Sequence, residues 1–131
     1  MSKYFVISVL IGVVWFGFLF GQKIEEIDIE EVQEAIQDSS DVILLDVRAK
    51  AEFNGPLRPV TGSILIPLSE LENRLSELDS YKDKRIIVIC RSGNRSRMAT
   101  GILIKRGFDA VNMKGAMLAW NEKFIIEEGL E

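Results

Sequence analysis

The sequence contains no histidine and only one cysteine, Cys90, among its 131 residues. Without histidine the chain cannot build a Ser-His-Asp triad, a Cys-His dyad or an imidazole-ligated metal site. A single cysteine excludes an intrachain disulfide, a Cys-x-x-Cys redox pair and a cage of thiolate ligands. We therefore expect no metal and no cofactor, and any chemistry must depend on one thiol, carboxylates and arginines.

Positive charge is also scarce, because 16 Lys and Arg residues face 20 Asp and Glu residues, for a net charge of −4. Such a balance provides no electrostatic footprint for DNA or RNA, so we expect no nucleic-acid partner. The length suits one small domain rather than two.

Charged residues are absent from residues 4–21, YFVISVLIGVVWFGFLFG, where 14 of 18 positions are hydrophobic. As a helix this run would extend about 27 Å, enough to cross a bilayer core. We interpret residues 1–23 as an uncleaved transmembrane anchor and residues 24–131 as the folded domain. A cleaved secretory signal is the main alternative, although bulky residues 18–20 stand where small residues would precede a cleavage site, and a buried helix is a third reading.

The charges that flank this run bear on its orientation. Lys3 and the amino terminus precede it, whereas Lys23 alone follows it before an acidic stretch. Positive charge before the span favours a cytoplasmic amino terminus. We therefore expect a single-pass membrane protein whose domain lies on the extracytoplasmic, periplasmic side.

Strand-like and helix-like patterns alternate through the remainder of the chain. The runs Val42–Leu45 and Ile86–Ile89 are continuously apolar, as in strands that are covered on both faces. Helical spacing of apolar residues follows most of the strands. Strands are expected at 24–27, 42–45, 63–66, 85–90 and 110–113, and helices at 28–37, 68–78, from about 95, and at 116–124. This order predicts an α/β domain with a central, mainly parallel five-stranded sheet and helices on both faces.

Cys90 ends the most apolar strand, and a polar loop with one glycine leads directly into a helix. Ligands of parallel sheets bind beyond the carboxyl ends of the strands, where backbone N–H groups and helix N-termini can cradle an anion. Together with Arg91, Arg95 and Arg97, this setting is expected to favour the thiolate of Cys90. The plainer alternative is a small apolar residue that ends a strand, beside a solvated charged turn.

Four segments, in order, resemble the family of rhodanese-domain sulfurtransferases over roughly residues 24–124. The loop Cys90-Arg91-Ser92-Gly93-Asn94-Arg95-Ser96 looks like the family's active-site loop. Asp46-Val47-Arg48 with Glu52-Phe53, Thr61–Pro67, and Gly107-Phe108 with Gly115–Trp120 match three further blocks. The chain departs from the family at Pro59, where a histidine is common in the stretch before Gly62, so the contacts of that histidine are in doubt.

The resemblance implies that Cys90 is the nucleophile and carries sulfur as a persulfide. The donor would be thiosulfate or a persulfide, held by residues 91–96: Arg91, Ser92, Gly93, Asn94, Arg95 and Ser96. Their backbone N–H groups would stabilise the sulfur anion, Arg95 would close the loop, and Arg91 would hold the sulfonate of the donor. Because the chain has no second cysteine, the acceptor must be cyanide or an external thiol, including that of a protein.

Three other interpretations remain open at this stage. A membrane-tethered sulfur carrier or docking module would keep Cys90 but turn over little. A cysteine phosphatase or arsenate reductase would need a Cys-x5-Arg loop, and here Arg95 follows Cys90 one residue too early. Asp46, Arg48 and Glu52 could form a catalytic set of carboxylates and an arginine, but we favour a structural role, with an ion pair between Arg48 and Glu52 that fixes the turn after the strand.

Overall fold

The two apolar runs form neighbouring strands near the centre of a five-stranded sheet in the computed structural model, which describes residues 23–38 and 41–125. All four pairings are parallel, in the order β1-β5-β4-β2-β3. The strands are β1 (Glu26–Ile27), β2 (Val42–Asp46), β3 (Ile64–Leu65), β4 (Arg85–Ile89) and β5 (Asp109–Met113). The predicted five-stranded parallel sheet is therefore confirmed.

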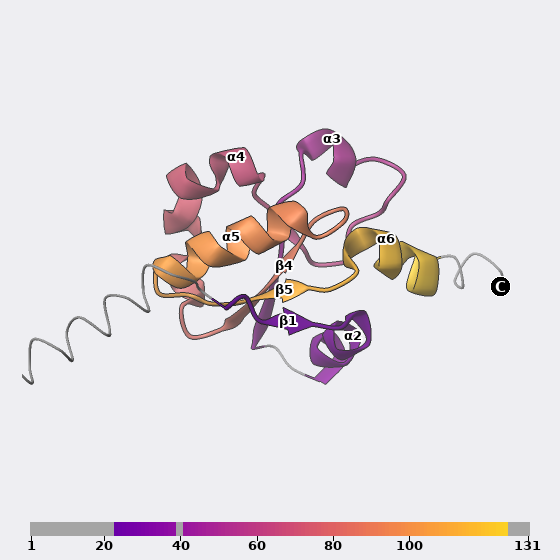
Figure 1. Ribbon diagram of the computed structural model, residues 1–131, viewed down its shortest axis with the longest axis horizontal. Coiled ribbons are helices and arrows are strands. Elements are labelled where there is room, and N and C mark those ends of the chain that lie inside the picture. Colours follow the sequence, from indigo (N-terminus) through magenta and orange to yellow (C-terminus); the bar gives the residue numbers. More distant parts are fainter. Residues whose placement is uncertain (1–22, 39–40, 126–131) are drawn as a thin grey trace, which may run out of the picture.

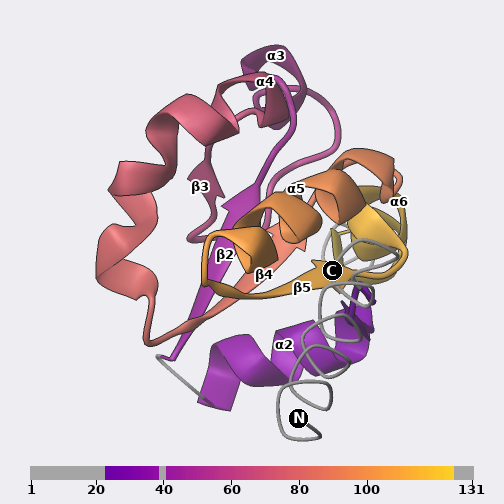
Figure 2. The ribbon, with the colours of Figure 1, turned by 60° about the vertical axis from the view of Figure 1, so that its left-hand side comes forward.

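Helices cover both faces of this sheet, as Figures 1 and 2 show from two directions. One face packs against α5 and against α4 with the 3-10 helical stretch that follows it. The other packs against α2, α6 and a closing π-helical turn. The helical elements are α2 (Ile29–Asp38), α3 (Lys50–Phe53), α4 (Leu68–Leu71), the 3-10 stretch Glu72–Tyr81, α5 (Asn94–Lys105), α6 (Ala116–Trp120) and the π-helical turn Asn121–Ile125.

The core consists of two apolar clusters, one on each side of the sheet, and β4 contributes to both. Ile86 and Val88 belong to the cluster beneath α5, whereas Ile87 and Ile89 belong to the cluster beneath α2 and α6. Successive side chains of a strand point to opposite faces, so an unbroken apolar run is what burial on both faces requires. All four side chains are fully buried, which places the carboxyl end of β4 at the centre of the molecule.

Several elements differ from expectation; for example, the strand expected at 63–66 covers only Ile64 and Leu65, and the helix expected at 116–124 turns π-helical after Trp120. α3 was not expected, because four residues are too few to produce a helical period. The helix expected over 68–78 is a single α-helical turn that continues as a 3-10 helix to Tyr81. The first strand is shorter than residues 24–27, because only Glu26 and Ile27 pair with β5.

Within residues 23–38 and 41–125, no helix is both long and apolar enough to cross a bilayer. The predicted anchor, residues 4–21, lies outside the residues that the structure describes.

Candidate active site

Cys90 begins the loop that joins the carboxyl end of β4 to the start of α5, between the ends of β2 and β5. Figure 1 shows this loop beside α3 and α6. The residue is 1% exposed and belongs to the apolar cluster beneath α5. The seven-residue segment singled out in the sequence thus begins at a buried sulfur.

Two groups of the loop contact the sulfur of Cys90 directly. The backbone N–H of Gly93 donates a hydrogen bond to Sγ at 3.0 Å, and Oγ of Ser96 lies 3.2 Å from Sγ. Gly93 adopts a φ of +114°, a conformation that L side chains rarely adopt, and this turn aims its N–H back at the sulfur. A sulfur anion at this position therefore has a fixed donor before any substrate arrives.

Ser96 is fully buried in the first turn of α5 and has two possible partners for one proton. Its hydroxyl lies 3.0 Å from the carbonyl oxygen of Gly93 and 3.2 Å from Sγ. When it donates to Gly93, it can accept from a Cys90 thiol; when it rotates, it can donate to a thiolate or persulfide. The same hydroxyl can therefore form a hydrogen bond with the sulfur both as a thiol and as a thiolate or persulfide.

The start of α6 holds the same loop from its other side. The N–H groups of Met117 and Leu118 donate to the carbonyl oxygens of Cys90 at 3.0 Å and of Arg91 at 3.2 Å. Met117 was not among the predicted site residues, because only backbone atoms take part and no side-chain motif marks them. The sequence signal lay in the Gly115–Trp120 block, whose Gly115 and Ala116 have positive φ values and turn the next amides toward the loop.

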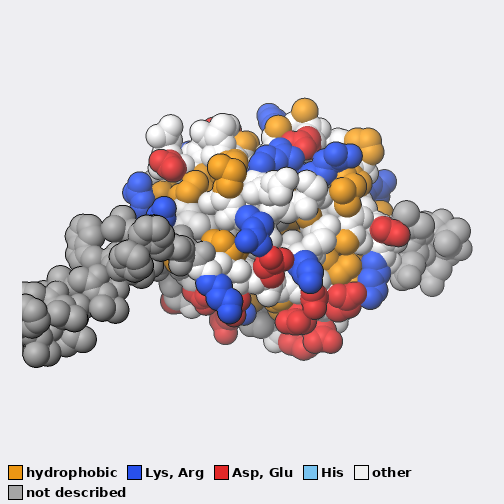
Figure 3. Space-filling view, viewed as in Figure 1, with side chains coloured by type: hydrophobic (Ala, Val, Ile, Leu, Met, Phe, Trp, Pro, Cys, Tyr) orange, Lys and Arg blue, Asp and Glu red, His pale blue; other side chains and the backbone are white. Residues whose placement is uncertain are grey.

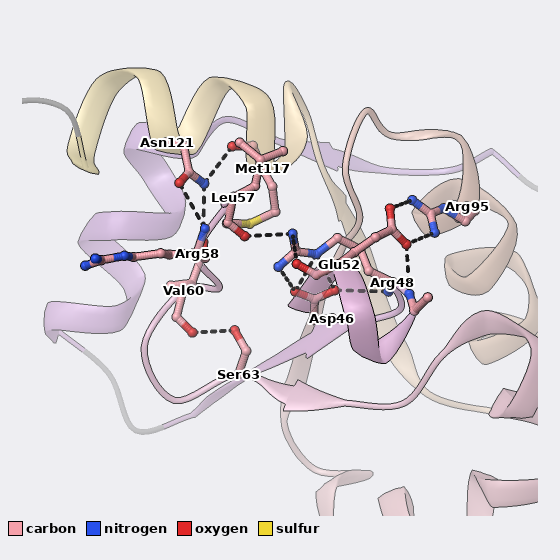
Figure 4. Close-up of polar contacts among 11 residues, drawn as sticks. Asp46, Arg48, Glu52, Leu57, Arg58, Val60, Ser63, Arg95, Met117 and Asn121 are labelled. Carbon is pink, nitrogen blue, oxygen red and sulfur yellow. Dashed lines mark hydrogen bonds and ion pairs between the residues drawn. The ribbon is translucent and has the colours of Figure 1, made fainter. Parts of the chain in front are cut away.

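Arg95 does not contact the sulfur but forms an ion pair with Glu52 of α3 (Figure 4). Its two terminal nitrogens lie 2.6 and 2.7 Å from the carboxylate oxygens of Glu52. The hydrogen bond from Arg95 lowers the pKa of Glu52 to about 2, and the carboxylate in turn raises the pKa of Arg95. The pair ties the first turn of α5 to α3, 43 residues earlier in the chain.

The expected ion pair between Arg48 and Glu52 is wrong. Arg48 instead forms a buried pair with Asp46, at 2.9 Å, and its third nitrogen donates to the carbonyl oxygen of Leu57 at 2.9 Å. Only a long 3.4 Å contact reaches Glu52, and it goes to the backbone oxygen. The reason is that Asp46 ends β2 fully buried and needs a cation beside it. The structural role proposed for Asp46 and Arg48 is consistent with these contacts.

A mouth cavity of about 230 Å³ adjoins the loop and is lined by Arg48, Glu52, Pro56, Leu57 and Arg91. Asp46 and Glu52 neutralise two of the nearby arginines, Arg48 and Arg95. Arg91 is exposed, and its side chain has no partner among the described residues. In Figure 3, Lys and Arg side chains lie over the region between α3 and α5, while acidic side chains gather over α2.

The other predicted site residues lie around the rim. Ser92 and Asn94 are exposed on the loop and at the start of α5. Arg97, expected to add charge near the sulfur, pairs instead with Glu26 of β1. Among the described residues, no group of three His, Cys, Asp or Glu side chains could hold a metal ion.

Comparison with known proteins finds related sequences and a related fold. The family model described as a rhodanese-like domain matches residues 28–123. The chain is 34% identical over 98 residues to a sulfurtransferase of Allochromatium vinosum, which covers 74% of this chain and 88% of that protein. It is 36% identical over 101 residues to a putative sulfur carrier protein of Bacillus subtilis, across 76% of this chain and 52% of that one. A crystal structure of a rhodanese-related protein from Thermoplasma volcanium superposes with a TM-score of 0.68 at 32% identity, covering 76% and 93% of the two chains.

Proposed function

This chain belongs to the rhodanese-like domain family, and from that premise we propose that it is a sulfurtransferase that carries sulfane sulfur on Cys90. The observation that supports this proposal best is the buried sulfur of Cys90, which receives the N–H of Gly93 at 3.0 Å. Relatives named as sulfurtransferases support the reaction class. The choice of Cys90 follows from its place in the loop and from the absence of any other thiol.

In the first half-reaction, the Cys90 thiolate attacks the outer sulfur of thiosulfate. A new S–S bond forms to Sγ, the S–S bond of thiosulfate breaks, and its electron pair leaves with sulfite. The enzyme is left as the persulfide anion. Gly93 and Ser96 stabilise the sulfur atoms, while Arg91, at the mouth cavity, faces the departing sulfite.

In the second half-reaction, an acceptor thiolate or cyanide attacks the outer sulfur of the persulfide. The bond to Sγ breaks, the Cys90 thiolate is regenerated, and a new persulfide or thiocyanate is released. No second cysteine exists in the chain to make this attack. The acceptor is therefore a separate molecule, either a small thiol or a protein that reaches the mouth cavity.

The intact mass of the full chain after brief exposure to thiosulfate tests this proposal. We expect a gain of one sulfur, about 32 Da, which is lost when cyanide or a thiol is added. The Cys90→Ser variant should show no gain. Absence of any adduct on a chain whose thiol still reacts with an alkylating agent would overturn thiosulfate as the donor.

A sulfur-carrier role is the second candidate, because one Bacillus subtilis relative is named a putative sulfur carrier protein and the chain has no resolving thiol. A carrier would load one sulfur per chain but turn over slowly with free cyanide. Steady-state thiocyanate formation from thiosulfate and cyanide separates the two roles. Many turnovers per Cys90 favour the enzyme, and a single stoichiometric burst favours the carrier.

Phosphatase or arsenate reductase chemistry has less support. It would need an arginine that faces the bound oxyanion from within the loop, and both terminal nitrogens of Arg95 are engaged by Glu52. Release of phosphate from p-nitrophenyl phosphate by the full chain, but not by Cys90→Ser, would favour phosphatase chemistry over sulfur transfer.

We extend the proposal to location: residues 4–21 anchor the domain in a membrane, with the domain on the extracytoplasmic side. The support is the uncharged run and the lysine that precedes it. Protease treatment of spheroplasts, from which the outer membrane has been removed, compared with lysed cells, tests the orientation. Digestion only after lysis would place the domain inside, and a mass that lacks the amino-terminal segment would indicate a cleaved signal.

A further inference from the structure

A second cavity, of about 310 Å³, lies away from the mouth cavity. It borders the apolar cluster beneath α2 and α6, whereas the sulfur of Cys90 belongs to the cluster on the other face of the sheet. We call it the Trp120 cavity; its lining includes Gln33, Gln37, Arg58, Pro59, Trp120 and Phe124. Nothing in sulfur transfer through Cys90 uses these side chains.

The only charged residue that lines this cavity, within the described part of the chain, is Arg58. Arg58 is exposed, and its guanidinium has no partner among the described residues. Figure 4 shows the side chain extending toward α2, away from the Asp46–Arg48 pair. Nearby Lys123 is already neutralised by Glu30 at 2.7 Å. Among the described residues, the cavity therefore presents one cation without a carboxylate partner, which suits a carboxylate ligand.

Part of the cavity lining is aromatic, formed by Trp120, which is 7% exposed, and by the half-buried Phe124. The rings of Trp120 and Phe124 lie with their centroids 4.6 Å apart. Val60, which is 5% exposed, adds an apolar surface, and the amides of Gln33 and Gln37 contribute polar groups from α2. A flat apolar ring can pack against such a surface while its charged group reaches Arg58.

The wall between the two cavities is held in place before any ligand binds. Asn121 is 7% exposed; its Oδ1 accepts the N–H of Arg58 at 3.1 Å, and its Nδ2 donates to the carbonyl oxygen of Arg58 at 3.2 Å. Pro59 fixes its own φ angle beside this clamp. Pro59, which stands where a histidine is common in the family, therefore lines the Trp120 cavity and not the mouth cavity beside Cys90.

We propose that the Trp120 cavity binds a small aromatic carboxylate, with its ring on Trp120 and its carboxylate on Arg58. The volume is at the lower end of the range for small-molecule sites, which limits the ligand to one or two fused rings. Binding here is separate from sulfur transfer, because no side chain of the cavity forms a hydrogen bond or ion pair with residues 90–96 among the described residues, and the two cavities share no lining residue.

Titration of the ¹⁵N-labelled full chain with 2-naphthoate tests this site. We expect saturable shifts of the Trp120 indole N–H and the Thr61 amide. Arg58→Gln should weaken binding about tenfold, since a charge-assisted hydrogen bond is lost. The neutral isostere 2-naphthamide should bind wild type about as weakly as 2-naphthoate binds Arg58→Gln. Arg106→Gln, which removes another exposed arginine at the end of α5, should change nothing.

Two further variants make the outcome decisive. Gln37→Trp fills the rim of the cavity from an exposed position and should abolish the shifts. Arg91→Gln alters only the mouth beside Cys90 and should leave them intact. Each of three results would overturn the proposal. They are loss of binding in Arg91→Gln with retention in Arg58→Gln, equal affinity for 2-naphthoate and 2-naphthamide, and the absence of any saturable shift. None of these results bears on sulfur uptake by Cys90, which is measured separately by mass.

Discussion

Gly93 shows how one backbone conformation can determine the chemistry of a site. Its φ of +114° directs its N–H to the sulfur of Cys90, and an added Cβ would meet no atom within 4 Å. In Gly93→Ala we therefore expect backbone strain without a steric clash, costing about 1–2 kcal/mol of stability. If the loop relaxes to relieve this strain, the N–H leaves the sulfur, and sulfur uptake from thiosulfate slows about tenfold or more. The rate of the mass gain measures this loss.

Gly107 offers a matched control for this experiment. It follows α5, has a φ of +87°, and an added Cβ would likewise meet no atom within 4 Å. Gly107→Ala should cost a similar amount of stability but leave sulfur uptake unchanged. Equal slowing in both variants would show that strain alone, and not the lost donor, accounts for the effect.

The ion pair between α3 and α5 makes stability depend on pH in the acid range. Arg95 lowers the pKa of Glu52 from its ordinary value of 4.5 to about 2. A depressed carboxyl pKa stabilises the fold above the unfolded value and loses that contribution as pH falls toward the folded value. We therefore expect the melting temperature of wild type to fall between about pH 4.5 and 2 more steeply than that of Glu52→Gln.

Arg95→Gln should reproduce the flatter acid profile, because Glu52 then has no guanidinium partner. Glu30 and Glu77 also have lowered pKa values, owing to hydrogen bonds from Lys123 and Arg74, and supply a background common to all three proteins. Thermal unfolding from pH 5.5 to 2.5 provides the comparison. Identical slopes for wild type and Glu52→Gln would contradict the assignment.

The side chain of Asn121 connects the end of α6 to the segment that separates the two cavities. It exchanges two hydrogen bonds with the backbone of Arg58 and donates a third to the carbonyl oxygen of Met117 at 2.9 Å. Asn121→Leu leaves the part-buried N–H and carbonyl oxygen of Arg58 without these partners and should cost about 1–3 kcal/mol, whereas the carbonyl oxygen of Met117 keeps the backbone N–H of residue 121. Asn121→Asp should be no better, because its carboxylate would replace the donor Nδ2 and face two carbonyl oxygens.

Hydrogen exchange measures the local part of this effect. The amide of Arg58 should exchange faster in both variants, with the increase concentrated in residues 54–61 and not in β4. A uniform increase across the sheet would indicate general destabilisation and would remove the clamp as an explanation.

At the scale of secondary-structure elements, the sequence predicted the elements that have an apolar periodicity, but it did not predict the contacts between them. The seven residues from Cys90 to Ser96 are consecutive. Predicting the end of one strand was therefore enough to place them together in one loop. Glu52 and Arg95 are 43 residues apart and meet only because β2 and β4 are neighbours in the sheet. The nearer residue Arg48, four positions from Glu52, was therefore chosen wrongly as its partner, since burial of Asp46 cannot be read from spacing alone.

For the whole molecule, the alternation of elements predicted the parallel sheet and its covered faces, because apolar runs such as Ile86–Ile89 require burial on both sides. The alternation of elements did not predict which segments line the two cavities. Residues 54–61 contain no regular element and are placed by Asn121, 63 residues away from Arg58, and by the carbonyl of Leu57 that accepts from Arg48. Sites formed by such segments depend on tertiary contacts that no local pattern records.

The depth of the sulfur within the fold also limits how two protein molecules can exchange it. Cys90 is 1% exposed, so the sulfur atoms of two chains cannot approach to bonding distance. We expect wild type to remain monomeric on a non-reducing gel after treatment with diamide. A single-cysteine control, Met98→Cys combined with Cys90→Ser, moves the thiol to a side chain that is 62% exposed and should form disulfide-linked dimers. Equal dimerisation of wild type would mean that the loop opens. If wild type stays monomeric, a protein acceptor must reach the outer sulfur of the persulfide, since Sγ itself is out of reach.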